Sequence, residues 1–135
     1  MPVIAKGITR PEDSIAAVKA GAAAVQVSNH GGRALDGTPA AITVLPRIAD
    51  ALQGCAPIIM DGGIRRGMDV AKALALGANA VALGRPVWWA LTVGGPGGVA
   101  GLIDYFNREL VNTVLHLGVD KIGSLGRQHV VRLNG

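Results

Sequence analysis

Two segments of this chain repeat one another in order and spacing, and this repeat restricts the possible folds more than any other feature. Residues 2–7 align with residues 57–62, and residues 20–25 align with residues 76–81, with one extra residue in the second copy. Each copy predicts a strand, a helix and a second strand, and its Gly-Ala turn lets the helix return closely to the sheet. Repeated units of this kind build a parallel α/β architecture.

The predicted strands are short apolar runs. Each run is too short for a helix and is bounded by Gly, Pro or Asn, which is typical of a strand. The four runs cover residues 3–5, 24–27, 58–60 and 81–83.

Segments of helical length lie between these runs. The first helix is predicted to begin at Pro11, with Thr9 as its cap, and to end at Gly21. The second spans residues 39–53, and the third spans residues 67–77, with an acidic residue in its first turn.

These elements make four strand–helix units. A doubly wound sheet can have the same count, but the near-regular repeat fits a (β/α)8 barrel better. We therefore predict an α/β fold in which residues 1–135 form one domain. This domain is the (β/α)4 half of a TIM barrel, followed by C-terminal helices.

Composition excludes several classes of protein. Half of the residues are hydrophobic and only 16% are charged, which excludes a disordered chain. The apolar runs are far shorter than a membrane span, and no signal peptide is recognisable. Cys55 is the single cysteine, which excludes a disulfide framework and a cysteine-based zinc site. We expect a cytoplasmic protein with no membrane partner and no metal ion in its site.

The basic residues favour small anions over nucleic acid. The formal net charge is +4, but aromatic residues make up only 3% of the chain, too few for base stacking. Several cations lie in separate short glycine-containing loops and do not form a stripe; they are Lys6, Arg33, Arg65, Arg66 and Arg85. We therefore expect no nucleic-acid partner.

Residues with catalytic potential follow the predicted strands, where barrel enzymes place their active sites. After the second strand, His30 can take a proton near neutral pH, and Arg33 can hold a carboxylate through two hydrogen bonds. After the third and fourth strands, residues 61–67 and 84–86 combine glycines, arginines and a helix start. Free amides and a helix N-terminus favour an anion there, so the two loops together predict a phosphate site.

Four motifs carry a family resemblance: Val-Ile-Ala-Lys-Gly at 3–7, Ser-Asn-His-Gly-Gly-Arg at 28–33, Asp-Gly-Gly-Ile-Arg-Arg-Gly at 61–67 and Gly-Arg-Pro at 84–86. In order and spacing they resemble the C-terminal half of the FMN-dependent α-hydroxy acid oxidases and dehydrogenases. Residues 94–99 and 107–110 are similar to lactate oxidase-like members. The family has Gln at the position of Ala34.

The resemblance implies the chemistry of the site. It implies oxidation of a small (S)-2-hydroxy acid, lactate- or glycolate-like, to the 2-oxo acid, with the electrons passing through FMN to oxygen or another acceptor. His30 would be the catalytic base and would bind the substrate together with Arg33, which holds the carboxylate. Lys6 would stabilise negative charge on the flavin, and Ser28 would hydrogen-bond the ring. The residues implied to bind FMN are Lys6, Ser28, Asp61, Gly62, Gly63, Ile64, Arg65, Gly84 and Arg85.

The same resemblance implies that part of the site is supplied elsewhere. The other half of the family's barrel holds further flavin contacts, a tyrosine pair and the aspartate that orients the histidine. We therefore expect this chain to be a fragment that is incomplete alone and, because its sheet has two open edges, a homo-oligomer. Two alternatives stay open: an FMN-dependent isomerase-type barrel, and a half-barrel that binds phosphate or FMN without catalysis.

Overall fold

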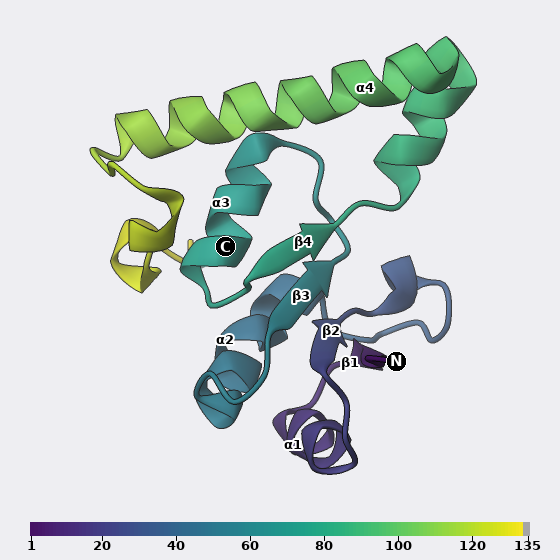
Figure 1. Ribbon diagram of the computed structural model, residues 1–135, viewed down its shortest axis with the longest axis vertical. Helices are drawn as coiled ribbons and strands as arrows, with labels where there is room; N and C mark the ends of the chain where they lie inside the picture. The colour runs from purple at the N-terminus through teal and green to yellow at the C-terminus, as the bar shows by residue number, and fades with distance from the viewer. Residues whose placement is uncertain (134–135) are drawn as a thin grey trace.

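A four-stranded parallel sheet organises the molecule, with its strands in the order β1-β2-β3-β4. The computed structural model describes residues 1–133. The chain alternates strands and helices up to a long final helix (Figure 1), in the order β1 (Ile4–Ile8), α1 (Pro11–Lys19), β2 (Ala24–Val27), the 3-10 turn η1 (His30–Gly32), α2 (Ala41–Leu52), β3 (Ile58–Asp61), α3 (Gly67–Ala75), β4 (Ala80–Ala82) and α4 (Arg85–His116). The predicted parallel α/β fold is confirmed.

The internal repeat is visible in the backbone of both copies. Gly21 and Gly77 follow α1 and α3 with φ angles of +97° and +109°. Their amides donate to the carbonyls of Val18 and Leu74, at 3.0 and 3.1 Å. Glycine adopts this left-handed conformation at no steric cost, so it turns each chain from its helix back to the sheet. The two strand–helix–strand units are therefore built alike.

The core lies between one face of the sheet and the helices that cover it. Alternate strand residues point to this face, where they pack against the apolar side of α2. The fully or nearly fully buried side chains of this core include Val25, Val27, Leu45, Ile48, Ile58 and Met60. The opposite face carries the polar residues Lys6 and Gln26 in one row with the apolar Ile59.

The observed ends of the helices agree only in part with the predicted ones. α1 begins at Pro11, as predicted, but its N-cap is Arg10, which makes no side-chain capping bond, so the prediction of Thr9 as the cap is wrong. α2 begins at Ala41, two residues later than predicted. It ends at Leu52, because the backbone of Gln53 turns left-handed with a φ of +46°.

The final helix is broken in its first half. Gly95 has a φ of +58° and a ψ of −151°, so α4 consists of two helical segments that meet at a bend. The longer second segment crosses α3, as Figure 1 shows. Two 3-10 turns follow, η2 (Ile122–Ser124) and η3 (Arg127–His129), and η3 packs beside α3. The predicted C-terminal helices are therefore present as α4 and these short turns.

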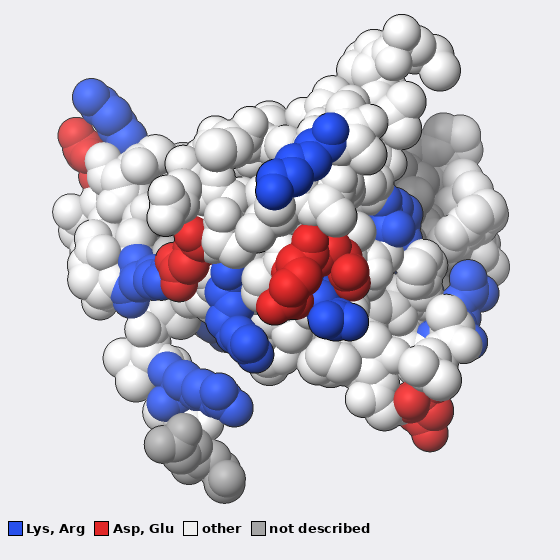
Figure 2. All heavy atoms as spheres, turned by 90° about the horizontal axis from the view of Figure 1, so that it is seen from below, with Lys and Arg blue, Asp and Glu red and all other residues white. Residues whose placement is uncertain are grey.

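The surface is mixed in charge. On the face drawn in Figure 2, basic side chains stand apart from one another, and some lie directly beside acidic ones. Among the helices of residues 1–133, none has the length and apolarity needed to cross a bilayer.

Candidate functional site

A cleft of about 380 Å³ opens at the carboxyl ends of the strands. It brings together His30, Arg33 and eight of the nine residues predicted to bind the cofactor. Those eight are Lys6, Asp61, Gly62, Gly63, Ile64, Arg65, Gly84 and Arg85. Ser28 lies beneath the lining with none of its surface exposed. The structure therefore brings most of the predicted site residues together in one cleft, and their roles stay predictions.

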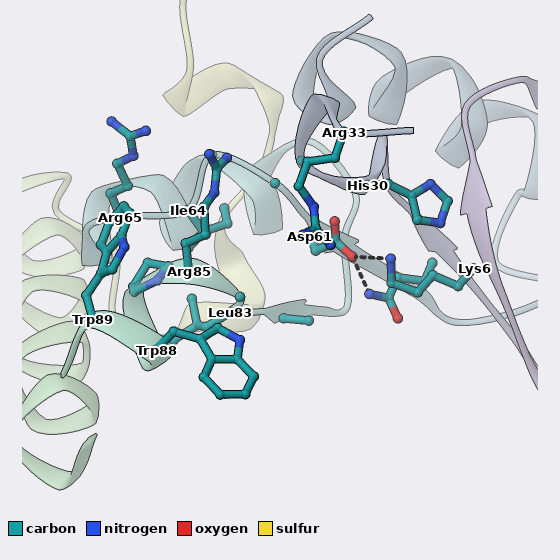
Figure 3. Close-up of a pocket in the computed structure, with 17 residues that line it drawn as sticks. Lys6, His30, Arg33, Asp61, Ile64, Arg65, Leu83, Arg85, Trp88 and Trp89 are labelled. Atoms are coloured by element: carbon teal, nitrogen blue, oxygen red, sulfur yellow. Dashed lines mark hydrogen bonds and ion pairs between the residues drawn. The ribbon is translucent and has the colours of Figure 1, made fainter. Parts of the chain in front are cut away.

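The cleft has two chemically different ends. Figure 3 shows Lys6, His30, Arg33 and Asp61 on one side, and Arg65, Arg85 and the two tryptophans on the other. The first group comes from β1, the end of β3 and the loop after β2. The second comes from the loop after β3 and the start of α4.

Asp61 is the centre of a polar network at the first end. Its Oδ1 accepts a hydrogen bond from the Ser28 hydroxyl at 2.5 Å, and its Oδ2 accepts one from Gln26 Nε2 at 2.5 Å. Lys6 Nζ lies 3.3 Å from the same Oδ2 and donates to Ser28 Oγ at 3.2 Å. Lys6, Gln26 and Asp61 lie in three adjacent strands and Ser28 directly follows β2, so the sheet register fixes their positions.

His30 has an unusual backbone. Its φ is +57°, a left-handed conformation that few residues other than glycine adopt and that costs energy. Its amide donates to Ser28 Oγ at 3.1 Å. Its imidazole covers Gly7, where an added Cβ would lie 2.5 Å from the ring Cε1. The missing side chain at Gly7 therefore makes room for the histidine.

The loop after β3 keeps part of its predicted anion-binding capacity. In residues 1–133 no hydrogen-bond acceptor is assigned to the amides of residues 62–64. The next amides are occupied: those of Arg65 and Arg66 both donate to Asp69 Oδ2 at 3.0 Å. That of Gly67 donates to Glu109. The expectation that the start of α3 offers free amides is therefore wrong, because two carboxylates cap it.

The loop after β4 faces the same space. Within the described part of the chain, the amides of Gly84 and Arg85 also have no assigned acceptor. The Arg85 side chain reaches toward the loop after β2: its Nη2 would lie 3.6 Å from a Cβ added at Gly31. An anion in the cleft would therefore meet amides from two loops and a guanidinium.

The cleft is also lined by residues that the sequence analysis had not assigned to it. Trp88 and Trp89, at the start of α4, are two of them and are 68% and 52% exposed. Gln26 is another. Its signal was available in the sequence, since it is the one polar residue in the run at 24–27.

An ion pair outside the cleft joins two distant parts of the chain. Arg127 donates from both Nη atoms to Asp50, and this hydrogen bonding lowers the pKa of the Asp50 carboxyl below its ordinary range. The pair joins η3 to α2. In the described chain, residues 1–133, no cluster of three or more His, Cys, Asp or Glu side chains has the arrangement of a metal site.

Comparison with known proteins finds relatives that are similar in sequence and in fold. A 46% identical crystal structure, of a mandelate oxidase, superimposes with a TM-score of 0.91 over 94% of this chain and 39% of that chain. An L-lactate oxidase from Nostoc sp. is 48% identical over 122 residues, which are 90% of this chain and 33% of that protein. A peroxisomal (S)-2-hydroxyacid oxidase from Arabidopsis thaliana is 46% identical over 96% of this chain and 36% of its own length.

The chain spans about a third of the length of the curated relatives it matches. The family described as FMN-dependent dehydrogenase matches residues 1–132, which is nearly the whole chain. The chain therefore belongs to the FMN-dependent dehydrogenase family.

Proposed function

We propose that this chain is the cofactor-binding part of an FMN-dependent enzyme that oxidises a small (S)-2-hydroxy acid to the 2-oxo acid. The observation that carries the proposal is the two-ended cleft. One end holds a histidine, an arginine and a lysine within one loop and one strand, and the other end offers backbone amides and arginines. Its volume lies in the range of small-molecule sites.

The donors of the cleft fit the parts of FMN. The amides at residues 62–64 and at Gly84 and Arg85 suit a phosphate, as do the guanidinium groups of Arg65 and Arg85. Lys6 would lie against the ring, and Ser28, which is buried beneath the lining, would hold Lys6 and Asp61 in place. Bound FMN would supply the acceptor for the two electrons of the substrate and their route to oxygen or another acceptor.

The remaining chemistry belongs to side chains of this chain. Arg33 would hold the substrate carboxylate through two parallel hydrogen bonds. His30 would take the proton that the substrate loses on oxidation and would keep the substrate in place beside it. Lys6 would stabilise negative charge that develops close to its ammonium group.

The half-barrel, its partners and its compartment belong to the same proposal. The open sheet, with helices over one face, supports the (β/α)4 half of a TIM barrel over residues 1–135. Such a sheet has free edges at β1 and β4, which supports association with another copy or with the other half of a barrel. The cytoplasm stays our proposed compartment, while some relatives are named peroxisomal enzymes.

Calorimetric titration with FMN tests the proposal. The unsubstituted chain should bind FMN, and Arg85→Ala should weaken binding about tenfold or more, because a charge-assisted contact to phosphate is lost. Arg108→Ala, exposed on α4 and outside the cleft lining, is the matched control and should bind normally. No FMN binding by the unsubstituted chain, or equal affinity in the Arg85 variant, would contradict the proposed site.

A second measurement separates a dehydrogenase from a barrel that only binds. In the complete protein, His30→Ala should keep FMN bound but should abolish bleaching of the flavin by 2-hydroxy acids under anaerobic conditions. Bleaching at the normal rate would remove His30 from the proposed role. An isomerase-type enzyme, with a diphosphate substrate, would not need Arg33 for a carboxylate.

A further inference from the structure

Gln26 is a polar residue at a position where its strand is otherwise apolar. Its neighbours in β2, Val25 and Val27, are fully buried in the core on the helix-covered face. Gln26 points to the opposite face, in a row with Lys6 on β1 and Ile59 on β3. A half-buried amide is costly unless it is hydrogen-bonded. The partner of Gln26 therefore indicates what this residue does.

That partner is Asp61. Gln26 Nε2 donates to Oδ2 of Asp61, and the Ser28 hydroxyl donates to Oδ1. An ionised carboxylate only accepts, so the amide nitrogen of Gln26 faces Asp61 and its carbonyl oxygen faces away. Both carboxylate oxygens thus receive a hydrogen bond from a neutral group. Each carboxylate oxygen of Asp61 therefore has a hydrogen-bond donor other than Lys6.

The contacts of Lys6 with this network are longer than those that Gln26 and Ser28 make with Asp61. Its Nζ lies 3.3 Å from Asp61 Oδ2 and 3.2 Å from Ser28 Oγ. Charge-assisted bonds are usually about 2.7–2.9 Å, so neither contact is a tight ion pair. The Lys6 side chain is 45% exposed, against 15% for that of Asp61. An ammonium has three protons, and with two directed at these partners one remains for a group in the cleft.

We propose that Gln26 is a positioning residue that satisfies Asp61 and so keeps the Lys6 ammonium available to an electron-rich oxygen bound in the cleft. Without the Gln26 amide, Oδ2 of Asp61 draws the ammonium toward itself, because a partly buried carboxylate seeks another donor. A glutamate at position 26 adds a second carboxylate, which attracts the Lys6 ammonium still more strongly. The inference rests on the proposed function only where it identifies that oxygen as part of the flavin.

Three variants of the full chain test the inference without any cofactor. Gln26→Met removes the amide at similar size, and Gln26→Glu replaces it with an isosteric carboxylate. Ile59→Met is the matched control in the same row of the neighbouring strand. Reductive methylation of each lysine at one fixed pH is followed by mass spectrometry, with Lys19 and Lys72 as exposed internal references in the same sample.

We expect Lys6 to react about threefold more slowly in Gln26→Met, the effect of one hydrogen bond, and more slowly still in Gln26→Glu. Ile59→Met should react at the rate of the unsubstituted chain. Equal or faster reaction of Lys6 in Gln26→Glu, whose shape matches that of the original side chain, would overturn the inference. Slower methylation of Lys6 in Ile59→Met would also overturn the inference, since any substitution in that row would then slow the reaction.

FMN provides a second and separate readout. Quenching of flavin fluorescence gives the affinity, and potentiometric titration gives the midpoint potential of the bound flavin. Both Gln26 variants should bind FMN more weakly and shift the potential to more negative values, with Gln26→Glu showing the larger change. FMN bound equally by all variants, at one potential, would overturn the inference and leave the proposed function standing. No FMN binding by the unsubstituted chain would overturn the proposed function, and the labelling of Lys6 would still decide the inference.

Discussion

Glu109 in α4 accepts a hydrogen bond from the backbone amide of Gly67 at 2.6 Å, with its Oε2 as the acceptor. Gly67 is the first residue of α3, so a carboxylate from one helix caps the start of another. Asp69 caps the two preceding amides. A negative charge at a helix N-terminus also interacts favourably with the helix dipole. The start of α3 is therefore a structural joint to α4 and not a place for a ligand.

Removing this joint should destabilise the fold. Glu109→Gln keeps the shape but loses the charge, and should lower the free energy of unfolding by about 0.5–1 kcal/mol. Glu109→Ala leaves the amide without its partner and should cost about 1–2 kcal/mol. Urea unfolding measures both. Asp104→Asn, an exposed site on the same helix, is the control and should change little. Equal stability of all three variants would show that the hydrogen bond contributes nothing.

Gly67 itself should not tolerate a side chain. A Cβ there would collide with the backbone nitrogen of Leu110 and the carbonyl of Phe106, neither of which can move without shifting α4. Gly67→Ala should therefore lower stability by about 1–3 kcal/mol, as overpacking does. Gly101→Ala is the contrast: it lies in α4 with open space around it, and should raise stability by up to about 1 kcal/mol. A stable Gly67 variant would mean that the two helices are not in close contact.

The pair of Arg127 and Asp50 should make stability depend on acidity. Arg127 hydrogen-bonds the carboxylate of Asp50 and lowers its pKa, so folding favours the ionised form. A lowered pKa contributes stability above the unfolded value, and this contribution is lost as the pH falls through the folded value. As the pH falls below about 4, the chain should therefore lose more stability than its Asp50→Asn variant does. Parallel loss in both proteins would show that the exposed pair has no effect.

Arg33 should not be replaceable by lysine in the complete protein. A lysine keeps the charge but cannot form two parallel hydrogen bonds with a carboxylate. Arg33→Lys should raise KM for 2-hydroxy acids about tenfold, while FMN affinity stays unchanged. Steady-state kinetics measures KM, and calorimetric titration measures the FMN affinity as the control. An unchanged KM would place the substrate carboxylate elsewhere.

The chain alone should associate in solution. The edge strands β1 and β4 have unpaired backbone groups, and Val3 and Ile4 beside one edge are 60% and 47% exposed. Open edges next to apolar surface pair readily with other chains. Light scattering at micromolar concentration should give a mass above 13.7 kDa. A cooperatively unfolding monomer would show that the sheet needs no further strands.

The local features of this fold could be predicted from the sequence, because local chemistry sets them. Short apolar runs mark the strands, and Gly21 and Gly77 mark the helix ends where only glycine turns the chain without strain. The cleft was predictable for a related reason: in parallel units the loops after successive strands meet at one edge. This placed His30 and Arg85 in the same cleft although 55 positions separate them in the sequence.

Partnerships between distant residues could not be predicted in this way. Glu109 lies 42 residues from Gly67, and nothing near either residue shows that one caps the other. The exposure of the tryptophans could not be predicted for a different reason. Large aromatic rings usually pack in a core, but Trp88 and Trp89 are 68% and 52% exposed. The burial of a side chain depends on which other elements pack against it, and the type of the residue does not specify this.

The network around Asp61 also has a consequence for how the sheet assembles. Lys6 and Gln26 both contact Asp61, which requires the observed pairing of β1, β2 and β3. A slip of one residue in any of these strands would turn its polar group toward Val25, Met60 and the rest of the apolar core. Burying an unbonded amide or charge there would cost several kcal/mol. The polar side chains of the cleft therefore also specify the register of the strands. A chain that folds in the wrong register loses stability as well as its site.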